Sequence, residues 1–452
     1  MKIVTIGGGN GQSNLLSAFY EYLGKNEKMR KIVKLSAIVS MSDDGRTTGK
    51  LMRAFDSELG IHLPPPGDLR RCLFALSDSK FRKNFQMLFE SLVSDEDEPI
   101  KNFTIKKIFF ETIKKILSDE KIFPITEKIY EDGRKIIIEE KNFSDEEKKL
   151  LQVKKNFEEF LHQEGFFFEH VKKILGEFLD YKIPLEEVIK GHKCGNLIMA
   201  GLYTEKGKFG AMIQRIHKLM KVPFDVIPVT MEKANIIAET DKGEVIESQD
   251  AISNAVDYEG RIETLQLTDC SKESDFNPYA GKKIEEADYI FIGPGDIFTS
   301  IGANFIFPKT KGYFQNTKAK IYFIANNTNK KGEASGFKVI DFIDEVINFL
   351  GVKIDGIFVN NKRLDLNLAD LDRFKNDISV KGGDFVYTTP QEEEYFKAKG
   401  IKVIKGDFLD RKTFYKHNKE NLMEKIFDEI EDTKEERISR KFIDFMKKAF
   451  GK

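Results

Sequence analysis

Short apolar runs alternate with helical patterns through the first quarter and the second half of this chain. The runs predict strands at 2–6, 34–41, 225–230, 288–293, 319–325 and 355–360. Between most of them, apolar residues recur at helical spacing. This alternation is typical of an α/β domain with a largely parallel sheet. Because ligands bind outside the carboxyl ends of such strands, the loops at 7–11, 42–49, 293–300 and 326–336 are expected to share one rim.

Residues 95–190 depart from this pattern. They contain few glycines and many Lys, Glu and Phe residues, and their apolar positions recur at helical spacing. We expect a helical insertion here, between an N-terminal part of the core at 1–94 and the rest of the α/β core at 191–390. Residues 391–452 are also charged and predict a C-terminal helical extension. Two roles stay open for the insertion, a lid or protein-binding surface and a solvated decoration.

A glycine-rich loop follows the first predicted strand. Gly8, Gly9, Asn10 and Gly11 lie between that strand and a helical pattern. Glycine allows positive φ and lets a ligand approach the backbone closely. The first N–H groups of a helix, with the helix dipole behind them, favour an anion. The loop therefore predicts a phosphate or diphosphate site, and the alternative is a tight turn that holds no ligand.

An acidic loop follows the second predicted strand. Asp43 and Asp44 stand at its carboxyl end, and Arg46 and Thr47 come directly after Gly45. An acid in this position can hold a ribose, and two acids can bind Mg²⁺ together with a phosphate. Arg46 is suited to a bidentate pair with a phosphate. The alternative is an ordinary acidic turn.

Asp68 follows three prolines and stands directly before a helical pattern. It suits an N-cap of that helix. It also suits a third carboxylate that faces Asp43 and Asp44, with Arg70 or Arg71 facing a phosphate. The residues themselves leave both interpretations open.

Two further loops precede helical patterns. In the first, His192 and Asn196 could contact a ligand oxygen or a base, or they could bond a neighbouring backbone group and cap the helix. The second follows the strand at 288–293 and repeats the arrangement of the opening loop. Four of its residues, two glycines and two with hydroxyl side chains, are expected to contact a ligand: Gly293, Gly295, Thr299 and Ser300. Two such loops on one rim predict a ligand with separated anionic groups, such as a nucleotide diphosphate.

The composition excludes several classes of protein. The chain has 452 residues and a net charge of −1, so no global field favours nucleic acid or an anionic membrane. No apolar run is long enough for a membrane span. The three cysteines form no CxxC pair, which argues against a disulfide framework or structural zinc site and is expected of a cytoplasmic protein. The chain opens on a predicted core strand rather than on a signal peptide.

Taken in order, these segments resemble the YvcK/CofD family, which joins the gluconeogenesis-factor (YvcK) proteins and the 2-phospho-L-lactate transferases (CofD). The matching segments are "GGGNG", "SMSDDGRTTGKL", "LPPPGDLRRCLFALSD", "GHKCGNLIMAGL" and "GPGDIFTSI". "VIPVT" and "NNTNKKGEASGF" resemble the YvcK branch more than the transferase branch. The resemblance covers about 1–90 and 190–360 and leaves out the insertion and most of the C-terminal part.

The resemblance implies a Rossmann-like three-layer core in a cytoplasmic dimer. In the YvcK branch it implies a UDP-sugar ligand, such as UDP-N-acetylglucosamine, and a role in cell-wall synthesis, cell shape and growth on gluconeogenic carbon. In the transferase branch it implies Mg²⁺-dependent transfer of a phospholactyl or phosphoenolpyruvyl unit onto a deazaflavin. The catalytic acids would then be Asp43, Asp44 and Asp68, with Asp44 and Asp68 at the metal.

Three residues depart from the family's pattern. Asn10 replaces a Thr, Arg46 replaces a Gly, and Asp296 stands where Ser is common. Asp296 adds negative charge beside a diphosphate loop, which would weaken anion binding there or recruit a metal. A third class, the NAD-dependent dehydrogenases, is disfavoured because Gln12 interrupts the G-x-G-x-x-G spacing.

Overall fold

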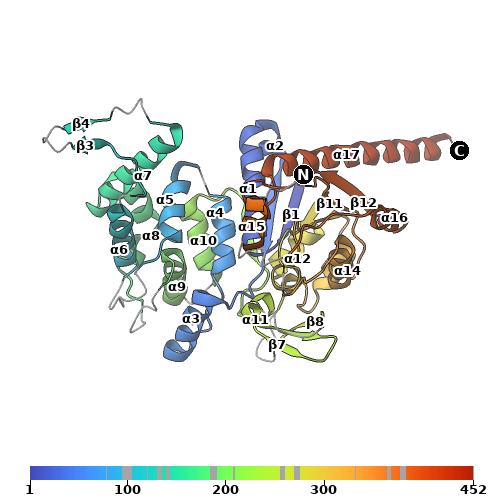
Figure 1. Cartoon of the computed structure of the whole chain (residues 1–452), viewed down its shortest axis with the longest axis horizontal. Helices are drawn as coiled ribbons and strands as arrows, with labels where there is room; N and C mark the ends of the chain where they lie inside the picture. The colour runs from blue at the N-terminus through green and yellow to red at the C-terminus, as the bar shows by residue number, and fades with distance from the viewer. Residues whose placement is uncertain are drawn as a thin grey trace.

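The computed structural model describes residues 1–77, 79–93, 104–119, 121–129, 135–138, 143–183, 191–206, 209–254, 260–268, 275–330, 332–363, 368–376 and 383–450. A seven-stranded sheet forms its centre, and helices flank the sheet (Figure 1). The helical segment that carries α5 to α10 gathers on one side of the sheet, at the left of Figure 1. The long helix α17 packs on α1 and extends past it.

All seven strands of the sheet are parallel, in the order β12-β11-β10-β9-β1-β2-β5. They are β1 (Lys2–Gly7), β2 (Lys34–Val39), β5 (Asp225–Pro228), β9 (Tyr289–Ile292), β10 (Lys320–Ile324), β11 (Gly356–Asn360) and β12 (Lys402–Gly406). Each of the six predicted strands is present. From β1 the chain adds strands first toward β5 and then, from β9 onward, toward β12. The strand order therefore reverses between β1 and β9, which is where ligands bind in such sheets.

The helices connect and cover these strands. They are α1 (Gly9–Lys25), α2 (Glu27–Ile32), α3 (Arg46–Ala54), α4 (Gly67–Ala75), α5 (Ser79–Glu90), α6 (Ile105–Ser118), α7 (Asp145–Leu161), α8 (Gly165–Leu175), α9 (Cys194–Lys206), α10 (Phe209–Met220), α11 (Gln249–Asn254), α12 (Pro278–Glu285), α13 (Thr310–Asn316), α14 (Val339–Leu350), α15 (Leu368–Asn376), α16 (Pro390–Ala398) and α17 (Lys419–Phe450). No helix within the described ranges is long and apolar enough to cross a membrane.

The core lies on both faces of the sheet, as parallel strands require. In β9 every side chain is buried, and Ile3, Val4 and Ile6 of β1 are at most 1% exposed. The apolar positions of α1 recur at helical spacing and are buried against this sheet. On the outer side of α1, Tyr22 stacks on Phe427 of α17 with ring centroids 4.3 Å apart. The predicted α/β core and the helical C-terminal region are thus confirmed.

The predicted insertion is largely helical and is held together by phenylalanines. Phe109 of α6 stacks on Phe160 of α7, and Phe160 contacts Phe167 of α8. Phe167 also lies 5.2 Å from Phe85 of α5, measured between ring centroids. The aromatic core of the insertion is therefore continuous with α5, a helix that lies outside residues 95–190. The insertion also contains two short antiparallel strands, β3 (Glu127–Ile129) and β4 (Lys135–Ile137).

Two features were not predicted. Strand β12 lies in the segment that we expected to be helical, and its pairing with β11 forms one edge of the sheet. Its side chains are mostly exposed or half-buried, so it lacks the apolar run that reveals an internal strand. A second, antiparallel sheet has the order β7-β6-β8, with β6 (Ile236–Thr240), β7 (Val245–Glu247) and β8 (Ile262–Leu267).

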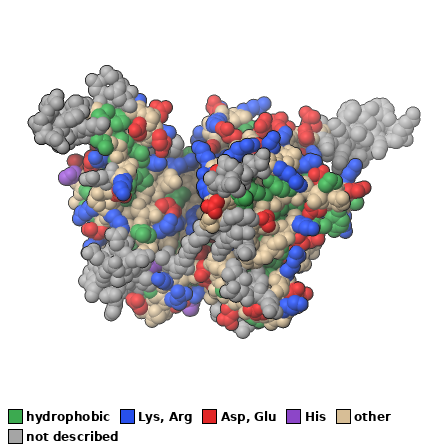
Figure 2. Space-filling model, in the orientation of Figure 1, with side chains coloured by type: hydrophobic (Ala, Val, Ile, Leu, Met, Phe, Trp, Pro, Cys, Tyr) green, Lys and Arg blue, Asp and Glu red, His purple; other side chains and the backbone are tan. Residues whose placement is uncertain are grey.

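Charged side chains of both signs are interspersed over the face shown in Figure 2. This distribution agrees with the net charge of −1. The described residues on this face therefore form no extended field of one sign.

Candidate functional site

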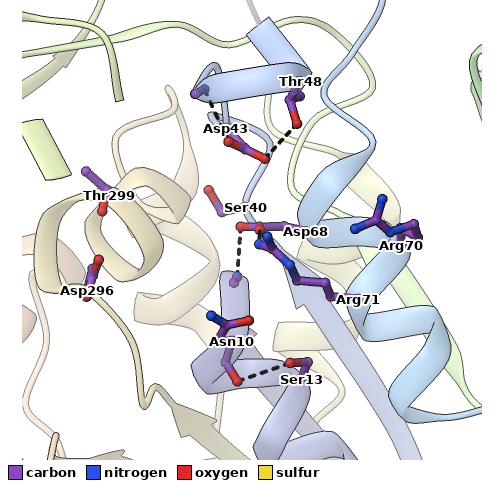
Figure 3. Close-up of polar contacts among 12 residues, drawn as sticks. Asn10, Ser13, Ser40, Asp43, Thr48, Asp68, Arg70, Arg71, Asp296 and Thr299 are labelled. Carbon is purple, nitrogen blue, oxygen red and sulfur yellow. Dashed lines mark hydrogen bonds and ion pairs between the residues drawn. The ribbon is translucent and has the colours of Figure 1, made fainter. Parts of the chain in front are cut away.

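A cavity of about 480 Å³ lies at the carboxyl ends of β1 and β9, where the strand order reverses. Nine of the residues predicted from the sequence line it: Gly8, Gly9, Asn10, Gly11, Asp43, Asp68, Asn196, Gly295 and Ser300. The loops that follow β1, β2, β9 and β10 all contribute to the wall, as expected of a shared rim. Figure 3 shows the part of this wall around the first turn of α1.

The two glycine loops lie directly against each other. Gly9 opens α1 with a φ of +58°, a conformation that favours glycine. A Cβ atom at Gly11 would overlap the carbonyl oxygen of Pro294 in the second loop, and a Cβ at Gly8 would lie 2.8 Å from an Asp68 oxygen. The close approach of these segments therefore depends on the absence of side chains. It leaves the first-turn amides of α1, which have no partner within the helix, in the wall of the cavity.

Asp68 does not cap its own helix. It lies in the first turn of α4, and its Oδ2 accepts a hydrogen bond from the Gly9 N–H at 2.8 Å. Its Oδ1 accepts from Nη1 of Arg71 at 2.9 Å. The carboxylate thus takes the place at the N-terminus of α1 that the helix dipole makes favourable for an anion.

Asp43 faces the same space as Asp68 (Figure 3). It accepts hydrogen bonds from the Gly45 N–H and the Thr48 hydroxyl, both at 3.3 Å. Burial, together with the nearby carboxylate of Asp68, raises the pKa of Asp43 to about 6. The site therefore contains a pair of acids, one of which titrates near neutral pH.

Asp44 points elsewhere. Its two oxygens accept the backbone N–H groups of Gln249, at 3.2 Å, and Asp250, at 3.0 Å, at the start of α11. Asp44 does not line the cavity, and the structure does not bring it together with Asp68. It instead holds α11, whose residues Asp250, Ser253 and Asn254 form one wall.

A basic group lies on the side of the cavity next to the helical segment. Arg70 and Arg71 of α4 both line the cavity, together with Lys193. The Arg70 side chain is almost completely buried, where it pairs with Glu90 and donates to the Asn196 side chain. Lys193 pairs with the same Glu90. These contacts fix the position of Asn196 in the wall.

Among the remaining predicted residues whose side chains are described, His192, Gly293 and Thr299 lie outside the lining. His192 is fully buried, neither ring nitrogen has a hydrogen-bond partner in the described part of the chain, and burial lowers its pKa to about 4. Gly293 directly follows β9 with a φ of +76°, and the Thr299 N–H donates to Glu333. The backbone of Arg46 and Thr47 begins α3, but their side chains fall outside the described residues.

Several lining residues were missed by the sequence reading. Asn326 and Lys330 belong to the predicted loop after β10, whose place on the rim was the available signal. Asn326 accepts from the Gly295 N–H at 3.0 Å and donates to its carbonyl at 2.8 Å, which fixes the second glycine loop. No signal in the sequence pointed to residues 415–417, which follow β12 and also line the cavity.

The carboxylates of Asp43 and Asp68 suit a divalent cation only together with a ligand. Among the described residues, no group of three or more His, Cys, Asp or Glu side chains is arranged to hold a metal ion. Mg²⁺, however, is often bound by one or two carboxylates together with the phosphates of a ligand. Asp43 and Asp68 supply that donor set. Burial and the repulsion from Asp68 raise the pKa of Asp43, and a cation would offset that repulsion.

Comparison with known proteins agrees with this fold. A relative from Aquifex aeolicus (strain VF5) is 26% identical over 369 residues, which cover 81% of this chain and 80% of the relative. A relative from Thermotoga maritima is 24% identical over 386 residues and 85% of each chain. Both carry the description "Putative gluconeogenesis factor". The crystal structure of a UPF0052 family member from Bacillus halodurans shares the fold, with a TM-score of 0.60, 21% identity and coverage of 92% and 96%.

The family model described as 2-phospho-L-lactate transferase CofD matches residues 3–409. That match includes both glycine loops, the acidic loop and the helices that carry Asp68 and Asn196. The chain therefore belongs to the CofD family.

Proposed function

We propose that this chain binds a nucleotide diphosphate in the cavity between β1 and β9. The ligand class is a UDP-sugar such as UDP-N-acetylglucosamine, and the role is that of a YvcK-like gluconeogenesis factor that regulates cell-wall synthesis, cell shape and carbon metabolism. The observation that carries the proposal is the meeting of two glycine loops at the point where the strand order reverses. Sites of this kind bind the diphosphate of a nucleotide.

The lining residues suit the separate parts of such a ligand. Asp68 already accepts the Gly9 N–H, so the amides that follow it in the first turn of α1 supply the N–H donors for the diphosphate. Arg71 and Lys193 supply positive charge nearby. Asn196 offers an amide group to a base or a sugar. The volume of about 480 Å³ lies within the range of roughly 300–1,000 Å³ that small-molecule sites occupy.

A second candidate is a CofD-like transferase that moves a phospholactyl or phosphoenolpyruvyl unit from a nucleotide diphosphate onto a deazaflavin-type acceptor. The pair of Asp43 and Asp68 favours it, because an acid with a pKa of about 6 is suited to accept a proton from an acceptor hydroxyl near neutral pH. Asp43 and Asp68 are also the residues that would hold Mg²⁺. A bound Mg²⁺ would offset the negative charge of the donor's diphosphate.

Isothermal titration separates these two functions. The purified chain is titrated with UDP-N-acetylglucosamine and with a phosphoenolpyruvyl-type nucleotide diphosphate, each with and without Mg²⁺. Binding of the UDP-sugar without metal supports the first function. Binding of the other donor only with Mg²⁺ supports the second, and binding of neither overturns both.

The variant Asn10→Asp locates the binding site. It places a fixed negative charge in the first glycine loop, and we expect at least a tenfold loss of affinity for the diphosphate ligand. The matched control is Asn316→Asp, at an exposed position that ends α13. Equal affinities of both variants and the parent chain would exclude the first loop from the site.

A further inference from the structure

An ion pair joins the second glycine loop to the loop after β10. Nζ of Lys330 lies 2.7 Å from Oδ2 of Asp296, and it donates to the Ser253 hydroxyl, also at 2.7 Å. Three segments that are far apart in the sequence therefore meet at one ammonium group. Lys330, Asp296 and Ser253 all line the cavity.

The local charge beside the second glycine loop is close to neutral in the structure rather than negative. From the sequence alone, Asp296 adds negative charge beside the diphosphate loop. In the structure, however, Lys330 neutralises that charge, and the Lys330 side chain is only 15% exposed. Glu333 lies behind the pair and is 2% exposed. Burial and the adjacent Asp296 raise the pKa of Glu333 to about 8, so at neutral pH it adds little negative charge.

The pair also fixes a side chain that would otherwise be flexible. A lysine has a long stem, and holding its ammonium group in one place costs conformational entropy. Asp296 and Ser253 hold it before any ligand arrives, so a ligand that uses this cation does not bear the whole cost.

We propose that Lys330 binds the anionic group of the ligand on the β9 side of the cavity, and that Asp296 and Ser253 are its positioning residues. Asp296 then promotes anion binding, although it carries a negative charge. The identification of this anion as part of a nucleotide diphosphate rests on the proposed function. The contact between Lys330 and a diphosphate group is independent of the proposed function, because inorganic pyrophosphate tests it directly.

The test uses titration calorimetry of the full chain with pyrophosphate and, separately, with UDP-N-acetylglucosamine. We expect Lys330→Met to weaken pyrophosphate binding about tenfold or more, whereas Lys330→Arg keeps most of the affinity. The matched control is Lys318→Met, an exposed lysine ahead of β10. Circular dichroism and thermal midpoints confirm that each variant is folded.

Asp296→Asn separates positioning from simple repulsion. If Asp296 only repels the anion, its neutralisation strengthens pyrophosphate binding. If it positions Lys330, we expect a loss of about threefold to tenfold, and that loss disappears when Lys330 is already Met. A merely structural role for Asp296 would give the same loss in both backgrounds.

Each outcome decides between the two proposals. Pyrophosphate binding that depends on Lys330, without binding of the UDP-sugar, supports this inference and counts against the proposed function. Binding of both ligands with no effect of Lys330→Met overturns the inference and leaves the proposed function standing. A parent chain that binds neither ligand overturns both.

Discussion

Glu333 offers a direct test of the electrostatics behind the second glycine loop. It is 2% exposed, and its carboxyl group accepts the Thr299 N–H at 3.3 Å. Burial, together with the adjacent Asp296, raises its pKa from 4.5 to about 8. The substitution Glu333→Gln tests this pKa. Glutamine keeps the shape of the protonated acid and its hydrogen-bond acceptor oxygen, but it cannot ionise.

The direction of the effect follows from the proton count. Between pH 4.5 and about 8 the unfolded chain has lost the proton from Glu333 while the folded chain keeps it. Unfolding then releases a proton, so the free energy of unfolding falls as the pH rises. Below this window both states are protonated and no cost arises, and above it the full cost is present. The difference between the pKa values in the unfolded and folded chain corresponds to roughly 3–5 kcal/mol of unfolding free energy.

We therefore expect Glu333→Gln to match the parent chain near pH 4 and to exceed its unfolding free energy by roughly 3–5 kcal/mol at pH 8.5. Urea unfolding followed by circular dichroism measures this difference, since the chain has no tryptophan. The control is Glu247→Gln, at an exposed position on β7. Its unfolding free energy should differ from that of the parent chain by the same amount at both pH values. A constant difference for Glu333→Gln as well would refute the reasoning.

Two further substitutions test the packing around the cavity. Gly11→Ala places a Cβ against the Pro294 carbonyl and should cost about 1–3 kcal/mol of unfolding free energy, whereas Gly24→Ala in the same helix meets no atom and should add about 0.5–1 kcal/mol. Asp44→Ala removes the acceptor for two α11 amides and should cost about 1 kcal/mol. Hydrogen exchange should then rise in α11, and unchanged exchange there would contradict the capping role of Asp44. Asp43→Ala serves as the control, because Asp43 makes no contact of this kind with α11.

The comparison of Asp43 with Asp44 shows how far the sequence reaches. Both were expected in the site because acids at the carboxyl end of a strand meet the ligand rim. Only Asp43 lines the cavity, while Asp44 turns to the backbone of α11. Adjacent residues in an irregular loop have no periodicity that fixes their direction, and the partner of Asp44 lies 206 positions away.

By itself, the sequence determined the parallel sheet and the glycine loops that end β1 and β9. Buried strands need apolar runs, and close backbone contacts need residues without a Cβ, so both requirements are visible locally. Only the tertiary structure decided that Asp296 is paired with Lys330, and that residues 415–417 join the wall. Such contacts depend on the order in which the strands lie in the sheet. That order brings together segments that are far apart in the sequence and share no local pattern that would predict their contact.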